Sequence, residues 1–206
     1  MHIGHLFVIE KALKTAIDKL YVVVSPQSPF KSMYDLASFN DRLEIAKATI
    51  KDRGLEDRVE VVDWERNNYP SYTIDTLEHA KKLLGENNEY TIFMGLDNFK
   101  SIDTWKCSNQ IVSEYGIYII PRDSENPTSI INEKITMLKE FYGNVKSITY
   151  SNPFESISIS ATDIRNILEK GEVLPKGVLS PSAIKYIQDK QLYNKQAVVV
   201  ESKKIP

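Results

Sequence analysis

Short apolar runs that alternate with segments of helical periodicity constrain the fold of this chain most. The runs are rich in Val, Ile, Tyr and Phe, and this order of elements is typical of an α/β protein in which helices cover both faces of a parallel sheet. We predict strands at residues 20–24, 59–62, 90–94, 116–120 and 147–150. The predicted helices span residues 5–18, 39–53, 73–84, 131–141, 162–170 and 180–189, and the last of these forms a small C-terminal helical extension.

The length and the charge of the chain limit the classes of function. Its 206 residues are enough for one well-cored domain, which we assign to residues 1–190, with residues 191–206 as a separate tail. A net charge of -2 gives no general attraction to nucleic acid or to acidic membranes. The single cysteine, Cys107, excludes an internal disulfide, and no segment has the form of a membrane span or a signal peptide. We therefore expect a soluble, cytoplasmic protein.

The motif His2-Ile3-Gly4-His5 stands at the start of the first predicted helix. Apolar residues follow it at helical spacing, so both imidazoles lie at the helix entrance, where the dipole favours anions. This arrangement predicts a phosphate site. An ordinary helix with surface histidines explains the motif equally simply when it is taken alone.

A second motif near the other end of the chain also suggests a phosphate site. Ser160 and Thr162 are good helix starters, and Arg165 follows about one turn later. Hydroxyl groups, free backbone N–H groups and a forked guanidinium are together suited to pyrophosphate. The alternative is an ordinary capped helix with a solvent-facing arginine.

Together, H-x-G-H and I-S-x-T-x-I-R resemble the paired signature of the nucleotidyltransferase superfamily. Over about residues 1–190, the order and separation of the intervening segments are similar to those of the bacterial nicotinate-nucleotide adenylyltransferase family. These segments are Ser25–Lys31, Pro70–Leu77, Met94–Asn98, Trp105-Lys106 and Ile117–Arg122. The resemblance implies a Rossmann-like sheet and adenylyl transfer from ATP to nicotinate mononucleotide, with pyrophosphate as the second product.

The resemblance also implies roles for the motif residues in binding ATP. His2 and His5 would contact the triphosphate, and Gly4 would let the nucleotide approach the backbone closely. Arg165 would hold the β- and γ-phosphates and stabilise the leaving pyrophosphate, together with Ser160 and Thr162. Mg²⁺ is expected to bridge the phosphates with water and few protein ligands, so we assign no metal-ligating residue.

Further residues are implied for the rest of the two substrates. Gly95 and Asp97 would contact ribose or base, although a plain helix cap explains them about as well. Trp105 would stack on the pyridine ring, and Tyr72-Thr73 would receive its carboxylate at a helix start; aromatic residues at such positions are otherwise often part of a core. Lys31 is assigned to the substrate phosphates, against the simpler interpretation of a solvated lysine.

One part of the family pattern is not found in the sequence. Relatives carry a strand and a loop resembling G-G-[ST]-F-[DN]-P before the histidines. Three explanations are open: the chain is truncated, another segment replaces the strand, or the protein is impaired. The candidate for a replacement strand is the apolar tail segment 197–200, with Lys203 or Lys204 near the phosphates. A disordered tail is the alternative to the replacement strand.

Two other functions remain open from the sequence. A pantetheine-phosphate adenylyltransferase would share both terminal motifs, and a non-catalytic relative would bind nucleotide without releasing pyrophosphate. The expected partners are ATP and nicotinate mononucleotide, with no nucleic acid and no membrane, and a homo-oligomer is left open.

Overall fold

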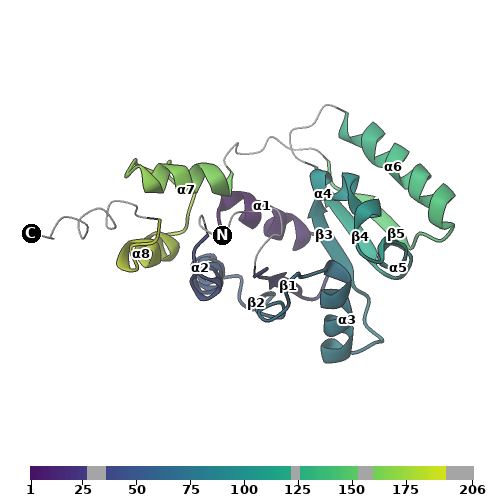
Figure 1. Ribbon diagram of the computed structural model, residues 1–206, viewed down its shortest axis with the longest axis horizontal. Helices are drawn as coiled ribbons and strands as arrows, with labels where there is room; N and C mark the ends of the chain where they lie inside the picture. The colour runs from purple at the N-terminus through teal and green to yellow at the C-terminus, as the bar shows by residue number, and fades with distance from the viewer. Residues whose placement is uncertain (27–35, 122–125, 153–159, 194–206) are drawn as a thin grey trace, which may run out of the picture. The chain divides into compact units, whose positions relative to one another are not determined.

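The computed structural model describes residues 1–26, 36–121, 126–152 and 160–193 (Figure 1). Lys31 and the tail segment 194–206, including the proposed replacement strand, lie outside these residues. The chain forms two compact units. We call residues 1–9, 16–67 and 157–206 the terminal unit, and residues 10–15 and 68–156 the central unit.

The central unit is built on three parallel strands. These are β3 (Thr91–Gly95), β4 (Gly116–Ile120) and β5 (Ser147–Tyr150), with β4 in the middle (Figure 1). The helices of this unit are α3 (Thr73–Leu84), α4 (Leu96–Lys100), α5 (Ser108–Glu114) and α6 (Pro127–Tyr142), with a short 3₁₀ helix at Ile102–Thr104.

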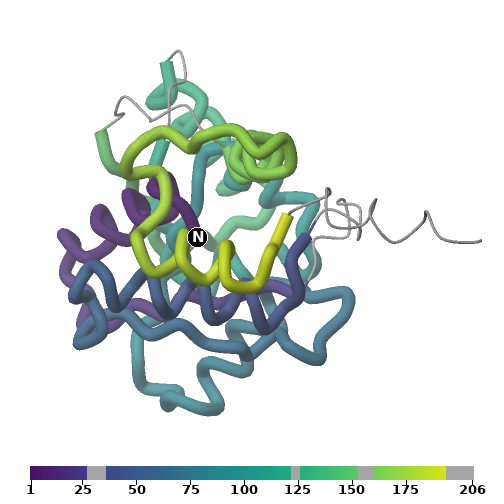
Figure 2. Tube along the Cα trace, turned by 90° about the vertical axis from the view of Figure 1, so that its left-hand side faces the viewer, coloured from purple at the N-terminus to yellow at the C-terminus, as the bar shows by residue number. Residues whose placement is uncertain are grey.

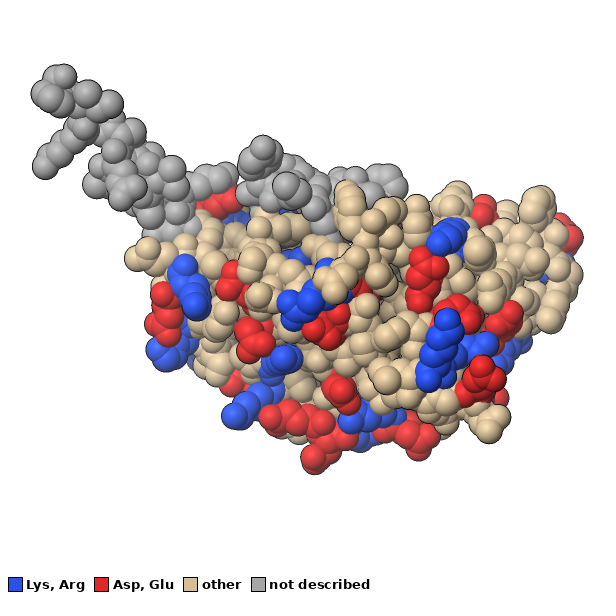
Figure 3. Space-filling view, turned by 60° about the horizontal axis from the view of Figure 1, so that its bottom comes forward, with Lys and Arg blue, Asp and Glu red and all other residues tan. Residues whose placement is uncertain are grey.

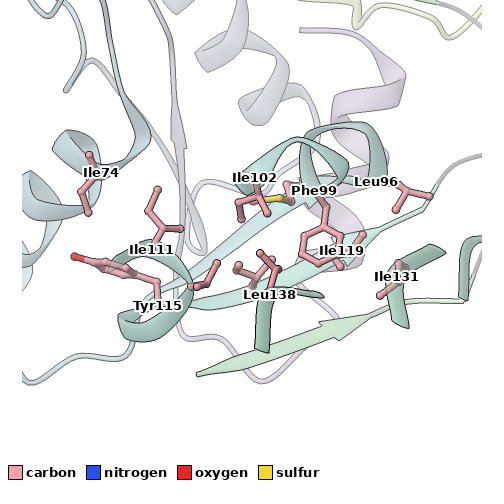
Figure 4. Close-up of a cluster of buried hydrophobic side chains, with 12 residues drawn as sticks. Ile74, Leu96, Phe99, Ile102, Ile111, Tyr115, Ile119, Ile131 and Leu138 are labelled. Atoms are coloured by element: carbon pink, nitrogen blue, oxygen red, sulfur yellow. The ribbon is translucent and has the colours of Figure 1, made fainter. Parts of the chain in front are cut away.

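A single hydrophobic cluster of buried side chains holds the central unit together (Figure 4). Phe99 and Ile119 are both 0% exposed in it, and residues of α3, α5 and α6 also contribute. Tyr115 is buried at its edge, and its hydroxyl donates a hydrogen bond of 2.7 Å to Glu78 of α3. Burial, with help from the Glu78 carboxylate, raises the pKa of the Tyr115 phenol. The sheet is thereby joined to helices from several parts of the sequence.

The terminal unit contains two parallel strands and four helices. Strand β1 (Leu20–Val23) pairs with β2 (Val59–Val62), with Val22 opposite Val61. The helices are α2 (Phe39–Asp52), α7 (Ala161–Glu169), α8 (Pro181–Asp189) and the beginning of α1 (Ile3–Ala12), which continues into the central unit.

Helices α2 and α8 are far apart in the sequence but lie side by side (Figures 1 and 2). Their apolar contact is a smaller cluster formed by Ile45, Ile164, Val178, Leu179, Ala183 and Ile187. Polar contacts reinforce it, because the amide and the hydroxyl of Ser182 donate to the Asp52 carboxylate at 2.8 Å and 2.6 Å. The Tyr186 hydroxyl donates to Asp41 at 3.0 Å. The chain's last described helix is thus firmly attached to α2.

The structure confirms the predicted α/β class and places all five strands within one residue of the predicted bounds. Four details differ. Helix α6 begins at Pro127 instead of residue 131, with the proline in its first turn. Helix α1 ends at Ala12 instead of residue 18, where the Thr15 hydroxyl donates to the Ala12 carbonyl at 2.6 Å and offers the backbone an alternative to the helix. Helices α4 and α5 were not predicted, because they are too short to show a clear period. Within the described residues, the strands form a two-stranded and a three-stranded sheet.

Candidate functional site

The two histidines of the first motif are locked together at the start of α1. The backbone N–H of His2 donates to Nδ1 of His5 at 3.3 Å, and the N–H of Gly4 donates to Nδ1 of His2 at 3.1 Å. The ring centroids are 4.0 Å apart. His2 is only 6% exposed, whereas His5 is exposed. Of the two imidazoles, His5 is therefore the more accessible to a ligand.

These hydrogen bonds determine which ring nitrogen can donate. A neutral imidazole that accepts at Nδ1 carries its hydrogen at Nε2. Each neutral ring therefore carries its hydrogen at Nε2, and the two rings are in contact with each other.

The histidine motif is fixed to the C-terminal part of the terminal unit. The N–H of Ile3 donates to the carbonyl of Val178 at 2.9 Å, and Val178 is a buried member of the cluster under α8. The first-turn N–H groups of Ile3 and Gly4 are therefore engaged within the protein. These two N–H groups are therefore not available to the anion that the helix dipole was expected to favour.

The second motif forms a capping box at the start of α7. The Asp163 N–H donates to the Ser160 hydroxyl at 3.1 Å, and the Ser160 N–H donates to the Asp163 carboxylate at 2.9 Å. The Ser160 hydroxyl and amide hold the pKa of Asp163 below its usual range. Arg165 lies half-buried one turn later and donates to the Thr162 hydroxyl at 3.0 Å. The predicted residues are together, but Ser160 is already engaged by a carboxylate.

Both motifs rest on the same small hydrophobic cluster. Ile164, between Thr162 and Arg165, belongs to this cluster with Val178, whose carbonyl binds the histidine motif. Segments about 160 residues apart in sequence are thereby joined within one compact unit. Both motifs thus belong to one packed region of the terminal unit.

The residues predicted for the pyridine ring come together in the central unit. Tyr72 is the N-cap of α3 and makes no side-chain capping hydrogen bond. Lys106, next to the half-buried Trp105, has its Nζ 3.0 Å from both carboxylate oxygens of Asp75 and 4.6 Å from the centre of the Tyr72 ring. Asp75 raises the pKa of Lys106. Lys106, to which no role was assigned from the sequence, thus connects the segment at Trp105 to the start of α3.

Gly95 and Asp97 lie at the carboxyl end of β3, as predicted. Gly95 ends the strand and precedes α4, and a Cβ atom added to it would meet no other atom within 4 Å. Asp97 is exposed in the first turn of α4. Gly95 is the N-cap of α4 and Asp97 the acidic residue of its first turn, so the helix-cap explanation stays open beside a contact with ribose or base.

Arg42 was not identified from the sequence. It lies near the start of α2, where a basic residue opposes the helix dipole, and this unfavourable position is the one signal the sequence offered. Its guanidinium donates to the carbonyls of Ser25 and Pro26, which follow β1, and of Ala37. Arg42 thus holds the carboxyl end of β1.

Three further features bear on binding of nucleic acid, membranes or metal ions. On the face in Figure 3, Lys and Arg side chains are interspersed with Asp and Glu. In the part of the chain that the structure describes, no helix is long and apolar enough to cross a membrane. The same residues contain no group of three or more His, Cys, Asp or Glu side chains that could hold a metal ion.

Known proteins match nearly the whole chain. The family model described as cytidylyltransferase-like matches residues 1–167. The probable nicotinate-nucleotide adenylyltransferase of Flavobacterium johnsoniae is 29% identical over 197 residues, covering 95% of this chain and 94% of that protein. The protein of the same description from Cytophaga hutchinsonii is 31% identical, covering 82% and 81%.

Solved structures show the same fold. The nicotinic acid mononucleotide adenylyltransferase of Plasmodium falciparum, complexed with NaAD, has a TM-score of 0.75 at 22% identity and covers 94% of this chain and 91% of its own. A putative nicotinate-nucleotide adenylyltransferase from Vibrio parahaemolyticus has a TM-score of 0.62 at 19% identity, with 94% and 88% covered. With both terminal motifs in place and the family model spanning residues 1–167, the chain belongs to the cytidylyltransferase-like family, in which its relatives are nicotinate-nucleotide adenylyltransferases.

Proposed function

We propose that this protein transfers the adenylyl group of ATP to nicotinate mononucleotide and releases nicotinate adenine dinucleotide and pyrophosphate, a step of NAD biosynthesis. The observation that carries the proposal is the joining of the histidine motif and the Arg165 helix on one hydrophobic cluster. The relatives' descriptions support the same reaction.

The chemistry needs alignment and charge stabilisation more than a base. A phosphate oxygen of nicotinate mononucleotide is already an anion and attacks the α-phosphorus of ATP, while the bond to the bridging oxygen of pyrophosphate breaks. The Nε2–H donors of His2 and His5 stabilise the negative charge on the transferring group, with the exposed His5 contributing more. The guanidinium fork of Arg165 and the Thr162 hydroxyl bind the leaving pyrophosphate.

Ser160 has a conditional role in this mechanism. Its hydroxyl and amide bind Asp163 in the described structure, so it contacts phosphate only if a phosphate oxygen replaces the carboxylate. The small side chain of Gly4 lets the nucleotide come close to the backbone.

The nicotinate half is assigned to the central unit. The N–H groups at Thr73 are to receive the carboxylate, and Trp105 is to stack on the pyridine ring. Gly95 and Asp97 are assigned to ribose or base, and Lys31, outside the described residues, to phosphate. A helix start favours an anion over a carboxamide, so we expect the acid to be preferred to nicotinamide mononucleotide.

Mg²⁺ fits this set of residues as a companion of ATP. Because the described residues contain no carboxylate cluster, the phosphate oxygens and water would supply most ligands, with Ser160, Thr162 and Arg165 holding the phosphates. The ion would neutralise phosphate charge when it is bound. We also place the protein in the cytoplasm, where a single free cysteine stays reduced.

Product analysis of the purified full chain tests the proposal. Incubation with ATP, Mg²⁺ and nicotinate mononucleotide should give equal amounts of nicotinate adenine dinucleotide and pyrophosphate, measured by chromatography and mass spectrometry. Parallel incubations with nicotinamide mononucleotide and with phosphopantetheine compare the acceptors. Faster turnover of phosphopantetheine would favour the pantetheine-type enzyme, and ATP binding without pyrophosphate release would favour the impaired relative.

A further inference from the structure

Arg42 is a half-buried cation whose hydrogen bonds go to neutral groups. Its Nε donates to the Ala37 carbonyl at 3.1 Å, its Nη1 donates to the Ser25 carbonyl at 2.5 Å, and its Nη2 donates to the Pro26 carbonyl. Burial lowers the pKa of this guanidinium, and no salt bridge to a carboxylate accompanies it among the residues that the structure describes. The neighbouring Asp41 is engaged by Ser38 and Tyr186.

A half-buried cation without a salt bridge loses part of its hydration, and the Phe39 ring, 5.6 Å from the guanidinium, is a further neutral neighbour. Three carbonyl groups bind the guanidinium but do not cancel its charge. The carbonyls come from two chain segments, one directly after β1 and one directly before α2. Arg42 therefore does two things at once: it fixes these segments to each other, and it leaves positive charge at the carboxyl end of a parallel strand, where ligands of α/β proteins bind.

Tyr193 connects this arrangement to the second motif by packing. It lies against the small hydrophobic cluster that contains Ile45 of α2 and Ile164 of α7. Burial raises the pKa of the Tyr193 phenol. Helix α2, which carries Arg42, and helix α7, which carries Arg165, are therefore packed on one cluster in the same unit.

We infer that Arg42 is a positioning residue for the nucleotide: it fixes the ends of the segments that flank the carboxyl end of β1, so that the positive site around Arg165 keeps its shape. The inference rests on the proposed function for the choice of ATP as the ligand. Arg42 is not assigned a contact with the reacting atoms, so its loss should weaken ATP binding more than it slows the chemical step.

Arg58 provides a matched control. Its Nη2 donates to a backbone carbonyl at the opposite end of the same strand, that of Ile17, at 2.7 Å. Both Arg42→Lys and Arg58→Lys keep the charge and lose the fork. The two variants therefore differ in which end of β1 loses its arginine.

The test measures KM for ATP, kcat at saturating nicotinate mononucleotide, and the Kd of ATP by calorimetry without the second substrate. Arg42→Lys should raise KM and Kd for ATP about tenfold and leave kcat within about twofold, as expected for lost charge-assisted hydrogen bonds outside the reacting centre. Arg58→Lys should leave all three within about twofold. Unchanged ATP affinity in Arg42→Lys, or equal shifts in both variants, would overturn the inference.

Two further results keep the test decisive. If Arg42→Lys does not fold by circular dichroism, Arg42→Gln takes its place, with a rise of about tenfold in the Kd of ATP expected from the lost hydrogen bonds to the Ser25 and Pro26 carbonyls and an unchanged Kd counting against the inference. If the wild-type chain binds ATP but forms no dinucleotide, the proposed function fails, and the calorimetric comparison still decides the role of Arg42. A wild-type chain that does not bind ATP refutes both.

Discussion

The interior of the central unit and that of the terminal unit are stabilised by different kinds of contact. The central unit has a continuous hydrophobic core around a three-stranded sheet, in which Phe99, Ile111 and Ile119 are fully buried. The described residues of the terminal unit form two strands and a smaller apolar cluster. Hydrogen bonds reinforce them, such as those from Ser182 to Asp52 and from Arg42 to three carbonyls. Both proposed phosphate motifs belong to the terminal unit. A polar framework keeps charged groups hydrated and available, which a tightly packed core does not allow.

The difference in packing should appear first as a difference in sensitivity to cavities. Phe99→Ala should lower the free energy of unfolding by about 3–5 kcal/mol, because it leaves a large cavity in the core of the central unit. Ile187→Ala, in α8 of the terminal unit, should lower the free energy of unfolding by about 2 kcal/mol, at the lower end of the range for buried Ile-to-Ala changes. Urea denaturation followed by circular dichroism measures both. A larger loss for Ile187→Ala would reverse the comparison.

A change in the terminal unit should instead affect catalysis. Arg165→Lys retains the charge but loses the fork that binds pyrophosphate, so kcat should fall about 10²–10³-fold, or about 2.7–4 kcal/mol in the barrier. Its unfolding midpoint should stay close to wild type, because the guanidinium makes one described hydrogen bond, to Thr162. Steady-state kinetics and thermal denaturation measure the two effects. Normal turnover would remove Arg165 from the mechanism.

Two tyrosines offer a closer comparison between the units. Tyr115→Phe removes one hydrogen bond to Glu78, which still accepts from Gln110, and should cost about 1.5 kcal/mol of unfolding free energy. Tyr186→Phe removes a similar hydrogen bond to Asp41 from a more hydrated part of the terminal unit and should cost less than about 1 kcal/mol. Chemical denaturation of both variants at pH 7 makes the comparison. Equal losses would mean that hydration does not distinguish the two sites.

The smallest expected effect is the pH dependence of the hydrogen bonds from Ser182 of α8 to Asp52 of α2. The Ser182 hydroxyl and amide lower the pKa of Asp52, so the stabilisation is complete above the unfolded carboxyl pKa of about 3.9 and is lost as the pH falls through the folded value. Because Asp52 is exposed, the contribution should be at most about 1 kcal/mol. Urea denaturation between pH 2 and pH 6 should show a weaker acid dependence in Asp52→Asn than in wild type. Ser182→Ala is the control and should weaken that dependence similarly; a wild-type profile in both variants would contradict the assignment.

The strands and both terminal motifs could be predicted because they depend on local pattern. Runs such as Leu20–Val23 and Gly116–Ile120 contain the residues that buried strands require, and the spacing of Ser160 and Asp163 is that of a capping box. The division into two units could not be predicted, because it depends on which strands pair across the chain. Arg42 was missed for the same reason: two of its three partners are carbonyls 16 and 17 residues earlier. Backbone acceptors carry no residue-specific signal.

The bond between Ile3 and Val178 has a consequence for synthesis of the chain on the ribosome. The central unit lies almost wholly within residues 68–156, so it can fold before the later part of the terminal unit has been made. His2 and His5 are made before the central unit, whereas their anchor, Val178, is made after it. During translation, the histidine motif can therefore reach its final position only after Val178 has been made.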